Sequence, residues 1–262
     1  MLKETEERLA RSLTADTTDA LPYLPYLLQD LWELGSCPRD MINLIRKHMP
    51  LSKDTRILDL GCGKGAVLVR IAESLGISVV GYDIMPDFIE YAKQKASEFG
   101  VSSLCHFTVG DANEIVETEK GYDCVILGAT GDILGRPPET LKKLKKTIKP
   151  EGFILLDEAF LPDGLNSDKA ILSNYEYLKH EQWLRLFDEN GLSLLGEVFS
   201  DEEYIDSFDS ETETIALRAS ELIARYPEKR TILEGYVQSQ SNECKDLENT
   251  IVGVTWMLRS SG

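Results

Sequence analysis

A glycine-rich turn between an apolar run and a helical pattern is the feature that most constrains this chain. Residues 56–66 read Arg-Ile-Leu-Asp-Leu-Gly-Cys-Gly-Lys-Gly-Ala, so Gly61, Gly63 and Gly65 follow the apolar residues directly. A short apolar run is typical of a buried parallel strand, and the apolar residues after the glycines recur with helical spacing. The segment therefore predicts a strand, a turn and a helix, with a turn that lets a ligand approach the backbone and the helix N-terminus.

The alternation of strand and helix patterns continues along the chain. Further strand patterns occur at residues 78–83, 104–109, 122–128, 153–157, 192–199 and 251–258. Strands that alternate with helices at this spacing favour a parallel sheet covered by helices on both faces. We therefore expect an α/β fold with a doubly wound, seven-stranded, mostly parallel sheet, N-terminal helices and a helical insertion before the last strand.

The segments outside this alternation suggest how the chain is divided. We expect a helical cap or lid, an α/β core, a helical insertion that serves as a substrate lid or a dimer surface, and the last core strand, at 1–50, 51–200, 201–248 and 249–262. Sequence patterns place boundaries only to within a few residues.

The N-terminal cap contains two helical patterns of its own. Leu24, Leu27, Leu28 and Leu31 share one helical face, Gly35 is a plausible C-cap, and a second helix is expected over 38–48. One interpretation is a helix that only covers the edge of the core. The other places three aromatic side chains on a substrate pocket: Tyr23, Tyr26 and Trp32.

Composition excludes several classes of partner. The 262 residues carry a net charge of −17, which argues against binding to nucleic acid or to an anionic membrane surface. We find no apolar run of the ~20 residues that span a bilayer and no signal peptide, so we expect a cytoplasmic protein, with a homodimer left open. The five cysteines and three histidines are scattered, and we therefore expect no metal site.

Two acids follow the second and third predicted strands. Asp83 ends the strand at 78–83, and Asp111 follows the strand at 104–109. The carboxyl ends of parallel strands meet at one edge of a sheet, where open α/β sheets bind ligands. Asp83 at that edge could accept the hydroxyls of a ribose, whereas its structural alternative is a helix N-cap. Asp111 could equally be a plain turn residue.

These features together resemble a known enzyme family. The pattern D-x-G-x-G-x-G that begins at Asp59, the acids Asp83 and Asp111, and the turn Lys-Pro-Glu-Gly at 149–152 occur in the order found in class I S-adenosylmethionine (SAM)-dependent methyltransferases, and the chain most resembles their small-molecule, UbiE-like branch. The resemblance implies a Rossmann-like methyltransferase fold, SAM as cofactor and S-adenosylhomocysteine (SAH) as product. The dinucleotide fingerprint G-x-G-x-x-G has a different spacing.

The resemblance also assigns roles to individual residues. It places Asp59 near the amino group of SAM, Asp83 at the ribose and Asp111 at the adenine amine. It surrounds the rest of the cofactor with the glycine turn, the residues beside the two acids and the backbone carbonyl after the fourth strand: Gly61, Cys62, Gly63 and Gly65; Ile84, Met85 and Ala112; and Gly128.

The acceptor side of the reaction is less defined. Asp157, Glu158 and Asp132 follow predicted strands and are candidates for a general base, although each could be a capping or surface acid. The sequence lacks the Asn/Asp-Pro-Pro-Tyr/Phe motif after the fourth strand and the Pro-Cys nucleophile of nucleic-acid methyltransferases, so we expect a small-molecule acceptor. The alternatives are a non-catalytic SAM-binding sensor and an NAD-dependent oxidoreductase on a similar sheet.

Overall fold

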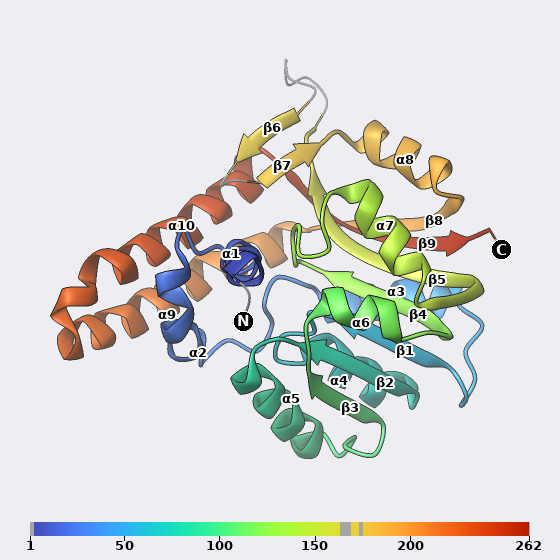
Figure 1. Cartoon of the computed structure of the whole chain (residues 1–262), viewed down its shortest axis with the longest axis horizontal. Helices are drawn as coiled ribbons and strands as arrows, with labels where there is room; N and C mark the ends of the chain where they lie inside the picture. Colours follow the sequence, from blue (N-terminus) through green and yellow to red (C-terminus); the bar gives the residue numbers. More distant parts are fainter. Residues whose placement is uncertain (1–2, 163–168, 173–174, 262) are drawn as a thin grey trace.

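The computed structural model describes residues 3–162, 169–172 and 175–261. Its centre is a seven-stranded sheet in the order β3-β2-β1-β4-β5-β9-β8 (Figure 1). The strands are β1 (Arg56–Leu60), β2 (Ser78–Asp83), β3 (Cys105–Val109), β4 (Tyr122–Gly128), β5 (Ile148–Phe160), β8 (Leu192–Phe199) and β9 (Val252–Ser260). All neighbours pair in parallel except β9, which is antiparallel to both β5 and β8. The predicted fold class is confirmed.

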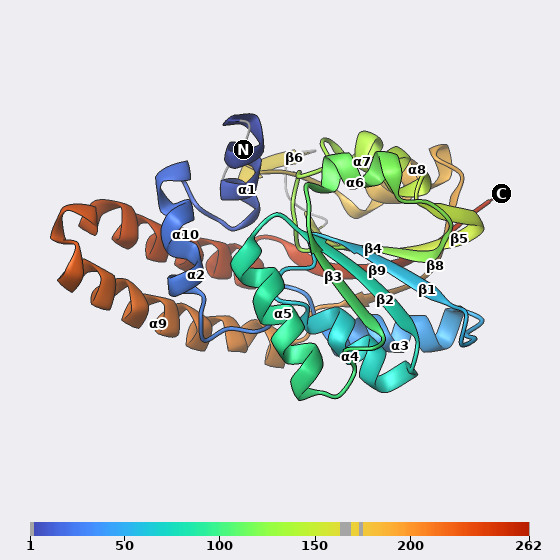
Figure 2. The same ribbon diagram turned by 60° about the horizontal axis from the view of Figure 1, so that its bottom comes forward.

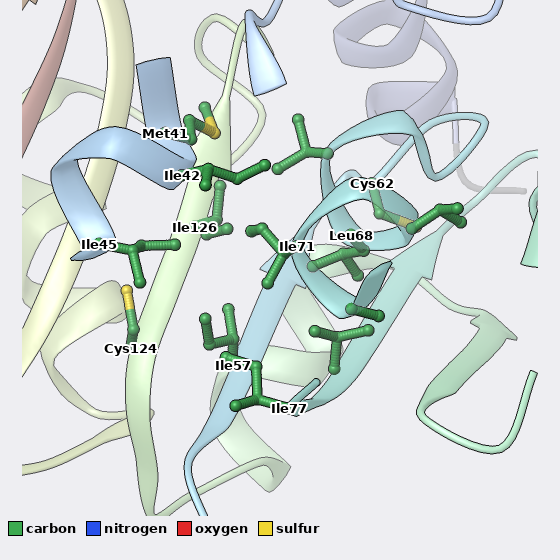
Figure 3. Packing of buried hydrophobic residues seen from close by; sticks show 14 of the residues in the cluster. Met41, Ile42, Ile45, Ile57, Cys62, Leu68, Ile71, Ile77, Cys124 and Ile126 are labelled. Carbon is green, nitrogen blue, oxygen red and sulfur yellow. The ribbon is translucent and has the colours of Figure 1, made fainter. Parts of the chain in front are cut away.

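Helices cover both faces of this sheet. The helices α3 (Pro38–His48), α4 (Ala66–Leu75) and α5 (Pro86–Glu98) lie on one face, and α6 (Ala112–Thr118), α7 (Pro137–Lys145) and α8 (His180–Glu189) lie on the other (Figure 2). Figure 3 shows the core on the first face, where Ile57 and Ile126 of the strands pack against Ile71 of α4 and Ile45 of α3. Because these side chains are fully buried, the strand ends that carry the functional residues are held on a rigid core.

The N-terminal segment is helical only in part. It forms α1 (Lys3–Ser12), the short 3₁₀-helix η1 (Thr18–Tyr23) and the four-residue helix α2 (Leu24–Leu27). The prediction of one helix that includes Leu31 and is capped by Gly35 is therefore wrong beyond Leu27. The ammonium of Lys64 explains the early end, because it takes the carbonyl oxygens of Leu28 and Leu31 as hydrogen-bond acceptors.

The insertion between β8 and β9 is a pair of long helices. The helices α9 (Glu202–Arg225) and α10 (Arg230–Asn249) are joined by η2 (Pro227–Lys229), and together they extend away from the sheet beside α1 and α2 (Figure 1). Buried apolar residues of the pair, such as Leu222 and Leu233, pack with Leu24 and Leu27 of α2. The N-terminal segment and the insertion, which lie at opposite ends of the sequence, therefore form one helical layer.

A small second sheet follows β5. It consists of β6 (Lys169–Leu172) and β7 (Tyr175–Leu178), which pair antiparallel and were not expected from the sequence. Among the described residues, none of the helices combines the length and the apolar character that crossing a membrane requires.

Candidate active site

The carboxyl ends of β1, β2, β3 and β4 meet around a pocket that we call the glycine-loop pocket. It encloses about 1040 Å³ of space between protein atoms, part of it open to solvent. The residues expected at a cofactor that line it are Asp59, Gly61, Cys62, Gly63, Asp83, Ile84, Asp111, Ala112 and Gly128. Gly65 and Met85 are not on this lining. The structure thus brings most of the predicted cofactor residues to one place.

The glycine turn keeps one wall of this pocket free of side chains. Gly61, Gly63 and Gly65 all have positive φ, at +78°, +51° and +74°. A Cβ at Gly61 would lie 2.8 Å from Cγ2 of Thr130, whereas a Cβ at Gly65 would lie 2.7 Å from Cβ of Ala92. Gly65 is therefore needed for the close packing of α4 on α5, and the first two glycines leave backbone exposed to the pocket.

Asp83 connects the glycine turn to the end of β2. Its Oδ2 accepts a hydrogen bond of 2.8 Å from the backbone N–H of Gly63, and its Oδ1 accepts one of 2.8 Å from the N–H of Met85. Burial raises the pKa of Asp83 to about 6, although the backbone N–H donors oppose the shift. The carboxylate therefore caps the segment before α5 and also lines the pocket. Met85 itself is buried in the helical layer.

Asp59 is a buried carboxyl group without a partner. The residue is only 4% exposed and lines the glycine-loop pocket, yet its side chain forms no hydrogen bond or ion pair with any residue that the structure describes. Burial raises its pKa to about 8, and the nearby Asp83 adds to the shift. Without a ligand, the proton neutralises this carboxyl near neutral pH, and a ligand that donates hydrogen bonds or carries positive charge would favour the carboxylate.

Asp111 is held by both α6 and α1. Its Oδ1 accepts a hydrogen bond of 2.8 Å from the backbone N–H of Asn113, so it is the N-cap of α6. Its Oδ2 lies 3.4 Å from Oγ1 of Thr5 in α1. The side chain therefore has a structural role, which was one of the two interpretations from the sequence, and it also lines the pocket.

The helix α1 covers the mouth of the glycine-loop pocket. It contributes the lining residues Thr5, Arg8, Leu9 and Ser12. These residues were not expected at the site from the sequence. The only signal was the spacing of Leu9 and Leu13, which indicates a helical face but not the surface that it covers.

A second pocket, which we call the acidic pocket, adjoins the first. It encloses about 1590 Å³ of space, part of it open to solvent, and it lies between the end of β5, residues 11–16, residues 28–35 and the helices α9 and α10. Ser12, Leu13, Leu34 and Ala129 line both pockets. A molecule in the acidic pocket would therefore lie next to one in the glycine-loop pocket.

Asp157 lies near the junction of the two pockets. It is the sheet neighbour of Gly128, and its backbone carbonyl accepts a hydrogen bond of 3.1 Å from the N–H of Ala129. Its side chain lines the acidic pocket, and burial raises its pKa to about 7, although the hydroxyls of Ser36 and Thr255 oppose the shift. A carboxyl with this pKa can accept or release a proton near neutral pH.

Comparison with known proteins identifies the family. The model of the methyltransferase domain family matches residues 51–191, which is more than half of the chain. The chain belongs to this family. An uncharacterised protein of Escherichia coli, YjhP, is 32% identical over 161 residues, which cover 60% of this chain and 64% of YjhP. The chain spans less than two thirds of the length of the first curated relatives that it matches.

Solved structures of low sequence identity confirm the fold of this methyltransferase-family chain. A SAM-dependent methyltransferase from Geobacter sulfurreducens, crystallised with SAH, is 21% identical, with a TM-score of 0.74 over 90% of this chain and 97% of that one. A cyclase, SpnF, is 18% identical, with a TM-score of 0.68 over 94% of this chain and 97% of that one. Because a cyclase shares the architecture, the fold alone does not define the reaction.

The remaining predicted site residues of this methyltransferase-family chain lie apart from one another. Asp132 forms an ion pair of 3.1 Å with Arg11 and is not among the described residues that line either pocket. Glu158 follows Asp157 on the lining of the acidic pocket. The structure therefore favours the two acids of β5 over Asp132 as candidates for a base.

The three aromatic residues expected at a substrate pocket are not brought together. The hydroxyl of Tyr26 donates a hydrogen bond of 2.6 Å to Glu221 of α9, and Tyr23 packs in the helical layer. Trp32 lines the glycine-loop pocket, where its Nε1 donates a hydrogen bond of 3.0 Å to the carbonyl of Lys64. Tyr23 and Tyr26 thus stabilise the cap, and only Trp32 lies at a pocket.

Proposed function

We propose that this protein is a SAM-dependent methyltransferase that acts on a small-molecule acceptor. The unpartnered carboxyl of Asp59 is the observation that carries the proposal, because a buried acid that faces a pocket favours a positively charged or hydrogen-bonding ligand over an uncharged apolar one. The amino acid end of SAM carries an ammonium group. The family assignment and the likeness to SAH-bound structures support the same ligand.

The residues that line the glycine-loop pocket support an assignment to the parts of SAM. We assign Asp59 to the ammonium group, the bare backbone at Gly61 and Gly63 to the methionine chain, and Asp83 to the ribose hydroxyls. Asp111 and Ala112 are assigned to the adenine end. Asp83 retains acceptor capacity for this role because a carboxylate offers about four lone-pair sites and the backbone occupies two of them.

The chain itself must orient the acceptor and exclude water. When bound, SAM supplies a methyl group activated by a positively charged sulfur. The helix α1 lines the pocket, as does Gly128, and Ala129 lines both pockets, so we assign the carbonyl of Gly128 to the side from which the acceptor would approach. Orientation of two reactants in this way can account for about 7–11 kcal/mol of a barrier. Asp157 is the candidate base, with Glu158 as its neighbour.

The acceptor would occupy the acidic pocket. Its walls come largely from α9, α10 and the N-terminal segment, so the insertion and the cap would act together as the substrate lid. A cytoplasmic location and a homodimer stay predictions from the sequence.

Calorimetry and isotope transfer test this proposal. We expect SAM and SAH to bind and NAD not to bind. Asp59→Asn should weaken the affinity for SAM more than it changes the stability of the ligand-free protein. Transfer of labelled methyl groups from SAM into a metabolite extract would then distinguish an enzyme from a sensor. Binding of SAM without any transfer would favour the sensor, and heat with NAD alone would favour the oxidoreductase.

A further inference from the structure

The acidic pocket has an unusual concentration of negative charge. Seven acidic residues line it: Asp16, Glu33, Asp157, Glu158, Glu211, Glu243 and Asp246. Arg11 is the single basic residue on the lining that the structure describes, and its guanidinium pairs with Asp132 outside the pocket. A low-dielectric cavity lined by one sign of charge attracts ligands of the opposite sign.

Several of these acids have no positive partner to balance them. Asp16 accepts a hydrogen bond of 2.8 Å from the hydroxyl of Ser239, and Glu243 accepts one from the hydroxyl of Thr14. These donors are neutral. The hydrogen bonds hold the carboxyl groups in place but supply no positive charge, and burial raises the pKa of Glu243, so a bound cation would favour its carboxylate form.

Glu33 and Glu211 are a like-charged pair on the same lining. Neither side chain forms a hydrogen bond with a described residue, and both are half-buried. Burial raises the pKa of Glu211 to about 7, and the proximity of Glu33 adds to this shift. Burial also raises the pKa of Glu33, but the charge of Arg70 opposes that shift, so Glu211 is the less balanced of the two and would be stabilised by a bound cation.

Tyr236 provides an independent sign of a ligand. The residue is only 2% exposed and lines the acidic pocket, yet its hydroxyl forms no hydrogen bond with any residue that the structure describes. Buried tyrosine hydroxyls usually find a partner, so this one points to a polar group from a ligand. The aromatic ring of tyrosine can in addition attract a cation.

The pocket suits an organic cation better than a metal ion. Among the described residues, no group of three or more His, Cys, Asp and Glu side chains is arranged to hold a metal. The acids are instead interspersed with apolar residues, including Leu13, Leu28, Leu31, Leu247 and Ile251. Such a lining matches a ligand with both a charged head and an apolar body.

We propose that the methyl acceptor is an amphipathic organic amine that binds the acidic pocket as an ammonium ion. This inference rests on the proposed function for its second half, namely that the bound amine receives a methyl group. The binding preference itself is a property of the pocket. The carboxylates of Glu211 and Glu243 would recognise the charge, and Tyr236 would supply a hydroxyl and an aromatic face.

The position of Asp157 is consistent with such an acceptor. An ammonium has no free lone pair, so one N–H bond must break first, and the proton would move to the Asp157 carboxylate. The neutral nitrogen would then form a bond to the methyl carbon while the carbon–sulfur bond breaks, leaving SAH. The nitrogen regains the positive charge that the sulfur loses, and Asp157 releases its proton to water.

Matched probes test the binding preference directly. We would titrate SAH-loaded protein at neutral pH with two series, one of hexylamine, hexanol and hexanoate and one of benzylamine, benzyl alcohol and benzoate. We expect each amine to bind at least about tenfold more tightly than its alcohol, with the carboxylate weakest. Equal binding within a series, a preference for alcohol or carboxylate, or no binding by either amine would overturn the proposal.

Charge-neutral variants locate the preference in the pocket. Glu211→Gln and Glu243→Gln should each reduce the ratio of amine to alcohol affinity by about threefold to tenfold. Glu213→Gln is a matched control, because Glu213 is exposed on the same helix and does not line the pocket. A preference that persists in both pocket variants would contradict the proposed site. A cooperative thermal unfolding transition without ligand reports whether each variant folds, and if SAH does not bind, the same titrations are made on the ligand-free protein.

The same measurements separate this inference from the proposed function. If SAH does not bind but the amines do, the proposed cofactor is wrong and the cation-selective pocket stands. If SAH binds but the amines show no preference, the methyltransferase proposal stands and the amine acceptor is rejected.

Discussion

The two adjoining pockets of this protein are built in different ways. The glycine-loop pocket is made largely of residues at the ends of consecutive strands, such as Asp59, Gly61 and Asp83. The acidic pocket draws on the N-terminal segment, the end of β5 and the helices α9 and α10. The first pocket depends on a rigid sheet edge, and the second depends on helices that a shared fold leaves free to vary. The contrast explains why a family motif identifies the cofactor and leaves the acceptor undefined.

The largest expected effect comes from a residue that supports both pockets, so its loss should affect both of them. Lys64 is 3% exposed and donates hydrogen bonds to the carbonyls of Leu28 and Leu31. These bonds hold residues 28–35, which contribute to the lining of both pockets. Lys64→Met removes two charge-assisted hydrogen bonds and leaves the carbonyl of Leu31 without a described donor, while the carbonyl of Leu28 keeps the N–H of Leu31. We expect a loss of about 4 kcal/mol in the free energy of unfolding. Thermal unfolding and SAH titration would show lower stability and weaker binding. Lys53→Met, at an exposed position, is the control and should change neither.

The largest single contribution to a pH dependence of stability should come from Asp59 in the glycine-loop pocket. Burial raises the pKa of Asp59 to about 8, above the value near 4 of an unfolded chain, so the folded state binds the proton more tightly. Its contribution to stability is complete below about pH 4 and is lost as the pH rises through about 8. Between about pH 5.5 and 8.5 we expect the ligand-free protein to lose about 3 kcal/mol of stability from this group.

Thermal unfolding across this pH range measures the effect. Asp59→Asn should flatten the profile more than Glu211→Gln, since Glu211 is half-exposed and its charge is screened by water. An equal or larger effect of Glu211→Gln would contradict this expectation, because Glu211 would then contribute at least as much as Asp59 to the pH dependence of stability.

The next effect should separate cofactor binding from amine binding. Asp83→Ala removes a carboxylate that accepts hydrogen bonds from Gly63 and Met85 and that we assign to the ribose. We expect SAH affinity to fall by about 1.5–3 kcal/mol, while the amine preference of the acidic pocket is retained. Glu90→Ala, at an exposed position of α5, serves as the control in the same calorimetric titrations. Unchanged SAH affinity in the folded variant would remove Asp83 from the cofactor site.

The smallest effect concerns Asp132, which was a candidate base in the sequence. Its ion pair with Arg11 joins the loop after β4 to α1, and both side chains are more than one third exposed. Exposed pairs contribute about 0–1 kcal/mol, so Asp132→Asn should change SAH affinity by less than about fivefold. Methyl transfer should be nearly unchanged once an acceptor is known. A large loss of transfer with intact SAH binding would restore Asp132 as the base and weigh against Asp157.

The sequence predicted the sheet because its signals are local. The apolar runs and the acids at 83 and 111 mark strand ends, and the parallel topology then brings those ends to one edge. The glycine spacing is also a local signal. Gly61 and Gly63 have positive φ and carry no side chain where the backbone meets the pocket.

The rest of the site depends on contacts between distant segments. Nothing near Leu27 shows that α2 ends there, because the Lys64 ammonium that takes the next carbonyls lies in the glycine turn. Glu33 of the cap lies near Glu211 of the insertion. Thr5 of α1 contacts Asp111, which lies 106 residues further along the chain. Local patterns carry no information on which of these segments meet.

The insertion leaves the sheet from the edge strand β8 and returns through β9, its antiparallel neighbour. Its two attachment points are therefore fixed by the ladder between these strands, whatever the length or composition of α9 and α10. The helical pair is therefore an insertion whose sequence can vary without changing the sheet. We expect that a different helical pair on the same two strands would change the acidic pocket and leave the glycine-loop pocket intact.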